Sequence, residues 1–285
     1  MAITTTTTLS DTIETVLESA RFTAKHKAIM ANLVWNIDRT ASKSPVANVP
    51  YFGTVTAYGL TEGVDMANPQ SMADTSVPIT PAEVGCQILL TDKVVRDDSE
   101  DVLRAAGRIL GDAMELKRDQ DLLGQLADGG TDLGSAGTAT LGIIAAAYAT
   151  LAGVPAPKPY VCVLHPYQIL DLVDVFTPLV STATYPTGSG GGLEDDILRN
   201  YMVGRLFGVD IIEEGNIGTT NGDGGMFSRG EGGGIILATA KDWSVETQRD
   251  ASLRATEVNV VGEYGVGEYL ATYIIELSIN CTAPA

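Results

Sequence analysis

Two histidines, His26 and His165, are the side chains best suited to acid–base chemistry at neutral pH. His26 stands between two lysines, a poor setting for a general base. His165 follows the apolar run 160–164, and a side chain at the end of a buried strand can belong to a binding site. Because no serine or cysteine elbow accompanies His165, a structural, half-buried histidine is the favoured interpretation. A soluble hydrolase or binding protein that uses His165 stays open as an alternative.

Cysteines and carboxylates form no recognisable metal or acid–base motif. Cys86, Cys162 and Cys281 are odd in number and far apart, which argues against a disulfide framework and a zinc site. The acidic pairs, such as Asp97 and Asp98, are sequence neighbours whose side chains point apart on a helix or strand. The sequence therefore predicts a protein that is not an enzyme, with no catalytic residue, no cofactor-binding residue, no metal ligand and no cofactor.

Two glycine-rich runs, 188–192 and 222–225, could in principle cradle a phosphate. The first run is followed by the three acids of 194–196, which would repel a phosphate. The second has no helix after it. We therefore expect both runs to be mobile surface loops and 215–234 to be a glycine-rich loop region.

Charge and size exclude several classes of protein. The 285 residues include 18 Lys and Arg and 36 Asp and Glu, so the net charge is 18 − 36 = −18. This balance argues against tight binding to nucleic acid or to an anionic membrane. A hydrophobic fraction of 45 % suffices for a sizeable core. The sequence contains no run of about 18 apolar residues, so no membrane span is expected.

The elements that must position these residues follow from the spacing of apolar residues and from turn residues. A capped helix is expected over 11–33, and a long hairpin with strand pieces at 49–52, 54–58 and 76–80. The hairpin region has no Lys or Arg between Lys43 and Lys93. The strongest helical pattern covers 97–127. Further helices are expected at 140–151, 166–176 and 194–202, and strands at 160–165, 207–212, 235–238, 244–248, 257–261 and 269–279.

These elements predict an α+β chain with two regions. One is an αβ lobe over about 138–234, and the other pairs the long helix with the C-terminal strands. An arm and a long hairpin bury little surface on their own chain, so they must find partners. This organisation indicates a self-assembling shell subunit.

Three segments carry a family resemblance: Val77–Gly85 (VPITPAEVG), Val163–Gln168 (VLHPYQ) and Arg249–Glu257 (RDASLRATE). With the order of elements, they make the chain similar to the major capsid proteins of tailed bacteriophages with the Hong Kong 97 fold. None of the three is a catalytic signature.

The resemblance implies a Hong Kong 97-like capsid fold, built from an N-terminal arm, an E-loop hairpin that reaches a neighbouring subunit, a long spine helix, and peripheral and axial domains. It divides the chain as follows: 1–44 N-terminal arm, 45–90 E-loop, 91–137 peripheral domain with the spine helix, 138–234 axial domain, and 235–285 C-terminal strands of the peripheral domain.

The implied function is a structural one. Copies of the chain would form the hexamers and pentamers of an icosahedral phage head that encloses double-stranded DNA, in a virion assembled in the bacterial host cytoplasm. An encapsulin-like nanocompartment shell enclosing protein cargo is the alternative within the same fold.

The resemblance also implies partners. They are further copies of the chain, portal and decoration proteins, and packaged DNA in loose, non-specific contact; no membrane is involved. Because the arm follows soon after Met1, we expect a separate scaffolding protein or none. Some members cross-link through an E-loop lysine, which this chain lacks, so no such cross-link is expected. The residues predicted to contact another subunit are Val49, Tyr51, Val55, Val64, Met66, Val77 and Ile79.

Overall fold

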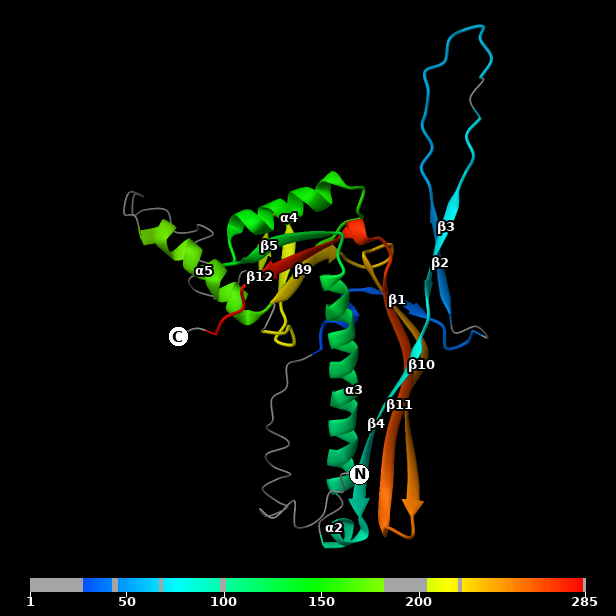
Figure 1. The fold of residues 1–285 in the computed structure, drawn as a ribbon, viewed down its shortest axis with the longest axis vertical. Helices are drawn as coiled ribbons and strands as arrows, with labels where there is room; N and C mark the ends of the chain where they lie inside the picture. Colours follow the sequence, from blue (N-terminus) through cyan, green and yellow to red (C-terminus); the bar gives the residue numbers. More distant parts are fainter. Residues whose placement is uncertain are drawn as a thin grey trace.

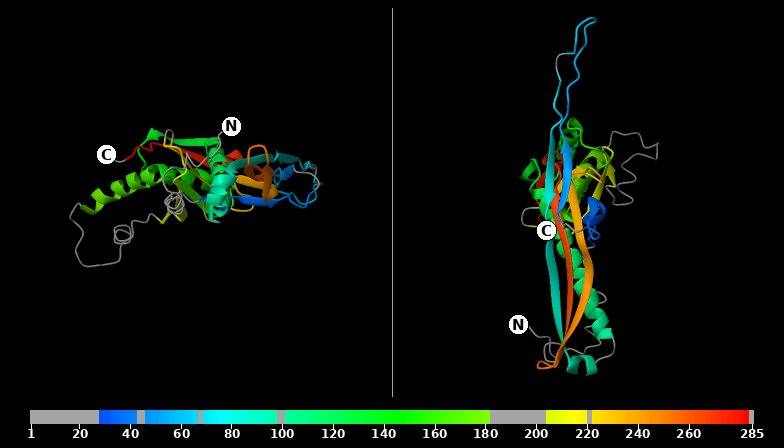
Figure 2. Two further views of the ribbon diagram at one scale, coloured as in Figure 1. Left: turned by 90° about the horizontal axis from the view of Figure 1, so that it is seen from below. Right: turned by 90° about the vertical axis from the view of Figure 1, so that its right-hand side faces the viewer.

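The chain is elongated, with a long helix at its centre (Figure 1). Three long strands run beside this helix, a second sheet with two helices lies at one end of it, and a hairpin projects beyond that end. Figure 2 shows the long strands as a narrow, twisted ribbon. The computed structural model describes residues 28–42, 46–66, 69–97, 101–181, 204–219 and 222–283.

Helices and strands mix along the chain, as the α+β prediction requires. The helical elements are η1 (Met30–Asn32), α2 (Asp92–Asp97), α3 (Asp101–Ala127), α4 (Leu141–Gly153), α5 (Pro166–Ser181) and η2 (Ala271–Tyr273). The strands are β1 (Trp35–Asp38), β2 (Ala47–Phe52), β3 (Asp74–Ile79), β4 (Ala82–Thr91), β5 (Thr131–Gly137), β6 (Tyr160–Leu164), β7 (Arg205–Leu206), β8 (Val209–Glu213), β9 (Asp223–Ser228), β10 (Ile235–Asp250), β11 (Ala255–Glu268) and β12 (Ile274–Ile279).

A six-stranded sheet in the order β5-β12-β9-β6-β8-β7 forms one end of the molecule. All five residues of β6 are buried, which explains its unbroken apolar run. Cys162 and Leu164 lie in the core that the sheet shares with α4, whereas Val161 and Val163 lie in the core shared with α3. The sheet is therefore covered on both faces.

A four-stranded sheet in the order β1-β10-β11-β4 forms the ribbon beside α3. Strands β10 and β11 make a long antiparallel hairpin, β4 pairs antiparallel with β11, and β1 pairs parallel with β10. Strand β4 was not expected as a strand. It places residues 82–91 in this sheet and ends the projecting hairpin at Ile79, short of the range 45–90 predicted for the E-loop.

Helix α3 joins the two sheets. Near its middle, Leu110 and Met114 pack with Val258 and Val260 of β11. Nearer its C-terminal end, Leu122 and Leu126 lie in the core shared with the six-stranded sheet. Its 27 residues span roughly 40 Å. The predicted spine helix is thus confirmed over 101–127, while 92–97 forms the separate helix α2.

An aromatic and charged cluster fastens α3 to the ribbon. The indole N–H of Trp243 donates a hydrogen bond to Glu115 Oε1 at 3.0 Å, and the Arg118 guanidinium lies 5.4 Å from the indole ring. The Tyr264 hydroxyl donates to Asp121 Oδ2 at 2.8 Å. Burial and this hydrogen bond raise the pKa of Tyr264. The cluster fixes the rotation of the helix on the sheet.

The glycine-rich segment 215–234 is not a loop throughout, and this expectation was wrong. It contains β9, a buried strand between β12 and β6. A Cβ atom on Gly224 would lie 2.7 Å from the Val163 carbonyl oxygen, and one on Gly225 would lie 2.8 Å from Leu126 Cδ2. Glycine serves close packing here, and composition alone does not distinguish that role from mobility.

The last strand also differs from expectation. The predicted grouping placed 269–279 with the strands beside the spine helix. In the structure, β12 pairs with β5 and β9 and so belongs to the six-stranded sheet. Sequence order gave no sign that the chain crosses back to the first sheet.

Some other local predictions were wrong, and some concern residues outside the described ranges. Residues 54–58 form no strand. The expected helix over 11–33 falls outside the described residues up to 27, and its described part forms the 3-10 turn η1 instead of an α-helix. The expected helix at 194–202 and the glycine run at 188–192 lie outside the described residues.

Gln168 links three segments and is fully buried. Its Oε1 accepts the His165 N–H at 3.0 Å, and its Nε2 donates to the carbonyl oxygens of Gly222 and Ile279 at 2.6 and 2.9 Å. The amide thereby ties the start of α5 to the start of β9 and to the end of β12.

We predict that Gly262→Ala destabilises the chain by about 1–3 kcal/mol, because a Cβ atom there would overlap the Trp243 ring. Urea unfolding measures the effect. Gly107→Ala is the matched control: nothing lies within 4 Å of its Cβ position on α3, so it should raise stability by about 0.5–1 kcal/mol. Equal midpoints for the two variants would contradict the packing assigned to Trp243.

We predict that Gln168→Leu lowers the free energy of unfolding by at least about 2 kcal/mol, because it removes three buried hydrogen bonds and leaves the His165 N–H and the Ile279 carbonyl group without the partner that Gln168 supplies. Gln120→Leu, on the exposed side of α3, should change stability by less than about 0.5 kcal/mol. Chemical denaturation of both variants checks this, and a small effect at position 168 would refute the linking role.

Candidate assembly surface

The projecting hairpin is anchored at its base by apolar packing. In the β2–β3 register Val49 lies opposite Val77. Val49 and Ile79 are only 5 % and 3 % exposed, and they pack with Ile236 and Ala238 of β10. Burying such a side chain contributes about 1.5–3 kcal/mol. The base of the hairpin is therefore part of the chain's own core.

Two glycines and a tyrosine shape the seat of the hairpin. Cβ atoms on Gly265 and Gly267 would lie 3.0 and 3.2 Å from the Ile79 side chain, so the absence of side chains there makes room for Ile79. The Tyr269 hydroxyl donates to the Pro50 carbonyl oxygen at 3.2 Å. The hairpin is thus held by packing and by a hydrogen bond where it leaves the body.

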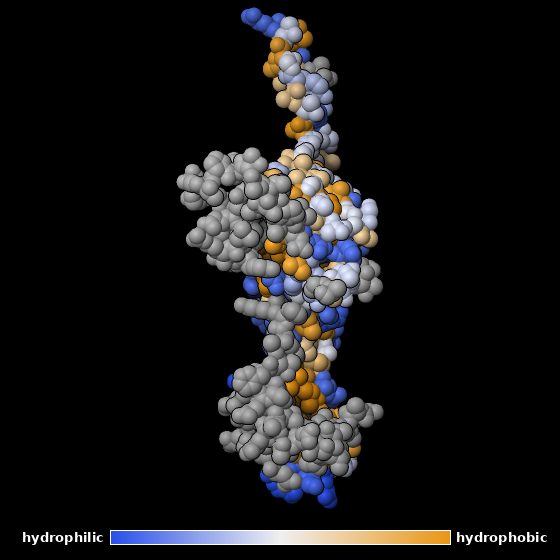
Figure 3. Space-filling model, turned by 90° about the vertical axis from the view of Figure 1, so that its left-hand side faces the viewer, coloured by the Kyte–Doolittle hydropathy of each residue, from blue (hydrophilic) through white to orange (hydrophobic). Residues whose placement is uncertain are grey.

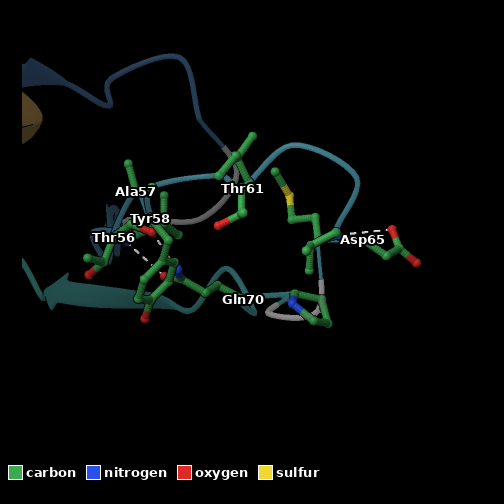
Figure 4. A pocket seen from close by; sticks show the side chains of 12 residues that line it. Thr56, Ala57, Tyr58, Thr61, Asp65 and Gln70 are labelled. Atoms are coloured by element: carbon green, nitrogen blue, oxygen red, sulfur yellow. Dashed lines mark hydrogen bonds between the residues drawn. The ribbon is translucent and has the colours of Figure 1, made fainter.

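Beyond Phe52 the two arms of the hairpin run on without a strand ladder, yet they stay together. The Gly53 N–H donates to the Ala73 carbonyl oxygen at 2.9 Å. The Gln70 amide spans the arms: its Oε1 accepts the Thr56 N–H at 2.8 Å, and its Nε2 donates to the Thr56 carbonyl oxygen at 2.5 Å (Figure 4). One side chain thus replaces a pair of ladder hydrogen bonds.

This distal hairpin, defined as residues 53–73, exposes large apolar side chains to solvent. Several of them surround a hollow of about 600 Å³ (Figure 4). Apolar residues recur along the projecting part in the space-filling view (Figure 3). The residues that are 58–72 % exposed are Val55, Tyr58, Leu60, Val64, Met66 and Met72. Such a concentration on a slender projection is typical of a surface that another protein covers.

The charges of the hairpin have one sign. Glu62 and Asp65 lie near its tip and Asp74 begins β3, and no Lys or Arg occurs between Lys43 and Lys93. An apolar surface bordered by carboxylates suits a protein partner better than a nucleic acid, whose phosphates it would repel.

The residues predicted to contact another subunit divide into groups. Val55, Val64 and Met66 lie in the exposed distal hairpin. Val49 and Ile79 are buried by their own chain and have little surface left to offer. Contact with a second subunit stays a prediction for all of them.

The remaining two predicted residues lie between these groups. Tyr51 is 37 % exposed, with its ring centre 6.5 Å from that of Tyr269, and Val77 is partly buried against the base. The prediction omitted three exposed residues, Tyr58, Leu60 and Met72. Taking every large apolar residue between the two strands would have found them.

His165 has the geometry of a structural histidine. It is 6 % exposed, its Nδ1 accepts the Tyr167 N–H at 3.2 Å, and the two ring centres lie 4.5 Å apart. The ring is thus held at the turn between β6 and α5. These contacts favour the structural interpretation over the hydrolase alternative.

The described ranges contain no group of three or more His, Cys, Asp or Glu side chains placed to hold a metal ion. Nor is any helix in the part of the chain that the structure describes long and apolar enough to cross a membrane. Cys162 lies in the core of the six-stranded sheet, where burial raises the pKa of its thiol to about 12.

Comparison with solved structures shows the same fold in phage particles. A structure from Mycobacterium phage Che8 superposes with a TM-score of 0.72 at 20 % identity, covering 89 % of this chain and 92 % of the other. The capsid structure of cyanophage P-SCSP1u gives 0.68 at 17 % identity, covering 91 % and 90 %. The head structure of Helicobacter pylori bacteriophage KHP40 gives 0.68 at 13 % identity, covering 91 % and 94 %.

Sequence comparison gives the family. No curated protein sequence matches the chain. Residues 74–275, well over half of the chain, match a family described as phage capsid protein. The matched range begins at β3 and extends to β12, so it includes α3 and most of both sheets. The chain therefore belongs to the phage capsid protein family and is a structural protein of the phage head.

Proposed function

We propose that the chain is the major capsid protein whose copies form the hexamers and pentamers of an icosahedral head around double-stranded DNA. The observation that carries the proposal is the distal hairpin. It extends beyond the chain's own core and presents large apolar side chains that nothing in the described residues covers. A second copy of the chain supplies the cover.

The energetics favour many modest contacts. Full burial of one large apolar side chain contributes about 1.5–3 kcal/mol, from which the ordering of the hairpin must be subtracted. A standard interface buries about 1,600 Å², and a subunit in a closed shell makes several. A slender hairpin can reach across a neighbour without requiring the two bodies to merge.

We propose a revised division of the chain. We assign residues 46–80 to the E-loop and the ribbon β1-β10-β11-β4 with the first half of α3 to the peripheral domain. The six-stranded sheet with α4 and α5, including β12, is assigned to the axial domain. The range predicted for the N-terminal arm, 1–44, lies mostly outside the described residues, and its described part includes β1, which we assign to the peripheral domain.

The acidic charge supports a loose relation to the genome. A wall with a net charge of −18 per subunit repels packaged DNA and lets it move, so that contacts stay non-specific. We further propose assembly in the host cytoplasm, with portal and decoration proteins as additional partners. Nuclease-protected DNA in purified particles would support this assignment, and protein cargo without DNA would instead identify a nanocompartment shell.

We predict that the double variant Leu60→Asp, Met66→Asp abolishes shell assembly but leaves the subunit folded. Both side chains are about two-thirds exposed, so the free energy of unfolding should change by less than about 0.5 kcal/mol. Carboxylates at these positions would have to be desolvated in an apolar contact, which opposes association. Sedimentation and negative-stain microscopy measure assembly, and urea unfolding measures stability.

Two controls make the result interpretable. Met66→Leu keeps the apolar character and should assemble normally. Ile79→Ala opens the buried base and should cost about 2–5 kcal/mol of subunit stability. Normal particles from the double aspartate variant would overturn the assembly role of the distal hairpin.

A further inference from the structure

A buried polar knot holds the first described turn of the chain against α3. Asp119, 1 % exposed, accepts the N–H groups of Ile29 and Met30 on the same oxygen, Oδ1, each at 3.0 Å. No side chain of η1 caps its own N-terminus, so the carboxylate of another element does so. The other oxygen, Oδ2, accepts a hydrogen bond from Asn216 Nδ2 at 2.9 Å.

A second buried carboxyl group completes the knot. Glu214, also 1 % exposed, follows β8, and its backbone N–H donates to the Leu164 carbonyl oxygen at 2.9 Å. Its Oε1 accepts the Asn216 N–H at 3.1 Å. Its Oε2 is buried without a hydrogen-bond partner among the described residues. If Glu214 were ionised, this oxygen would carry buried negative charge without a donor, which is costly; protonation removes that charge.

The charges around Glu214 oppose its ionisation. Asp119 of α3 is the charged side chain that acts on it, and its negative charge adds to the effect of burial. The cations nearby are engaged elsewhere: Arg118 pairs with Glu115, and Arg229 donates to the Asn32 carbonyl oxygen at 3.4 Å. No Lys or Arg in the part of the chain that the structure describes forms an ion pair with the knot.

Other ionisable residues belong to the strands that end near the knot. Glu213 is exposed at the end of β8. His165, at the end of β6, packs on Tyr167, and Asp223 lines a hollow together with Asn216. Burial, with a smaller contribution from Asp119, raises the pKa of Glu214 to about 7 from an ordinary value of 4.5, and outweighs the opposing effect of the polar groups of Asn216 and of the Ile29 N–H.

We propose that Asp119, Glu214 and Asn216 form an acid-tightened latch, which holds the chain at Ile29–Met30 when Glu214 carries a proton and loosens when Glu214 ionises. The moving part is η1, a three-residue turn that Asp119 holds at its N-terminal end through the Ile29 and Met30 N–H groups. The latch thus couples pH to the attachment of Ile29 and Met30 to α3, which the proposed function does not address.

The direction of the pH effect follows from the number of protons that the closed and the opened latch bind. Between pH 4.5 and about 7 the closed latch binds more protons than an opened one, in which Glu214 meets water. Opening therefore becomes more favourable as the pH rises through this window, by up to tenfold per pH unit, and is level above it.

Amide hydrogen exchange of the full chain tests the latch. After correction for intrinsic exchange rates, the protection of Ile29 and Met30 should fall at least about tenfold between pH 5.5 and 7.5. Glu214→Gln keeps the shape without an ionisable group, so protection should stay constant across this range. Glu213→Gln, the exposed neighbour, should behave like the unaltered chain. Amides of β6 serve as the internal reference, because both faces of that strand are buried.

Asp119→Ala covers the case in which Glu214→Gln fails to fold. It removes the acceptor of both N–H groups, so their protection should be lost at every pH while that of β6 remains. The latch would be overturned by protection that stays constant with pH in the unaltered chain, or by a pH effect that persists in Glu214→Gln. It would also be overturned if, at constant pH, protection changed on addition of calcium chloride, because the carboxyl groups would then respond to a cation and not to a proton. The exchange measurement does not require shell assembly, so its result is independent of whether the proposed function is correct.

Discussion

The packing of α3 against two sheets is the constraint on which the rest of the structure depends. One helix supplies Leu110 and Met114 to the ribbon core and Leu122 and Leu126 to the core of the six-stranded sheet. Because a helix of roughly 40 Å is stiff, it sets the distance between the two sheets. The Trp243 cluster fixes its rotation, so the relative placement of both sheets follows from one element.

The sequence predicted those elements whose buried apolar residues follow a simple pattern. The heptad-like apolar spacing gave the helix over 101–127, and the unbroken apolar run gave β6. Strands β1, β4, β5 and β9 were not predicted, and in β4 and β9 the composition suggests something else. Strand β4 contains a glycine and polar residues on its exposed face, and β9 needs glycine where Val163 and Leu126 approach closely. Tertiary packing, which no local pattern carries, decided both.

The same distinction explains the assembly surface. Alternation along β2 and β3 correctly marked apolar positions, but it could not tell which of them their own chain buries. That depends on Ile236 and Ala238, more than 150 residues away in the sequence, and on the glycines that seat Ile79. The distal residues, in contrast, extend beyond the described body of the chain and stay 58–72 % exposed, as the length of the hairpin requires. The polar knot at Asp119 was also beyond prediction, because its members come from three separate segments.

The position of β12 has a consequence for synthesis. Its two neighbours in the sheet, β5 and β9, leave the ribosome well before it does. Until residues 274–279 emerge, both neighbours present open edges, and the nascent chain cannot close its larger sheet. A copy whose translation stops early therefore lacks a finished body, even though it already carries a complete hairpin. Every residue up to Ile279 must therefore be made before the six-stranded sheet can close.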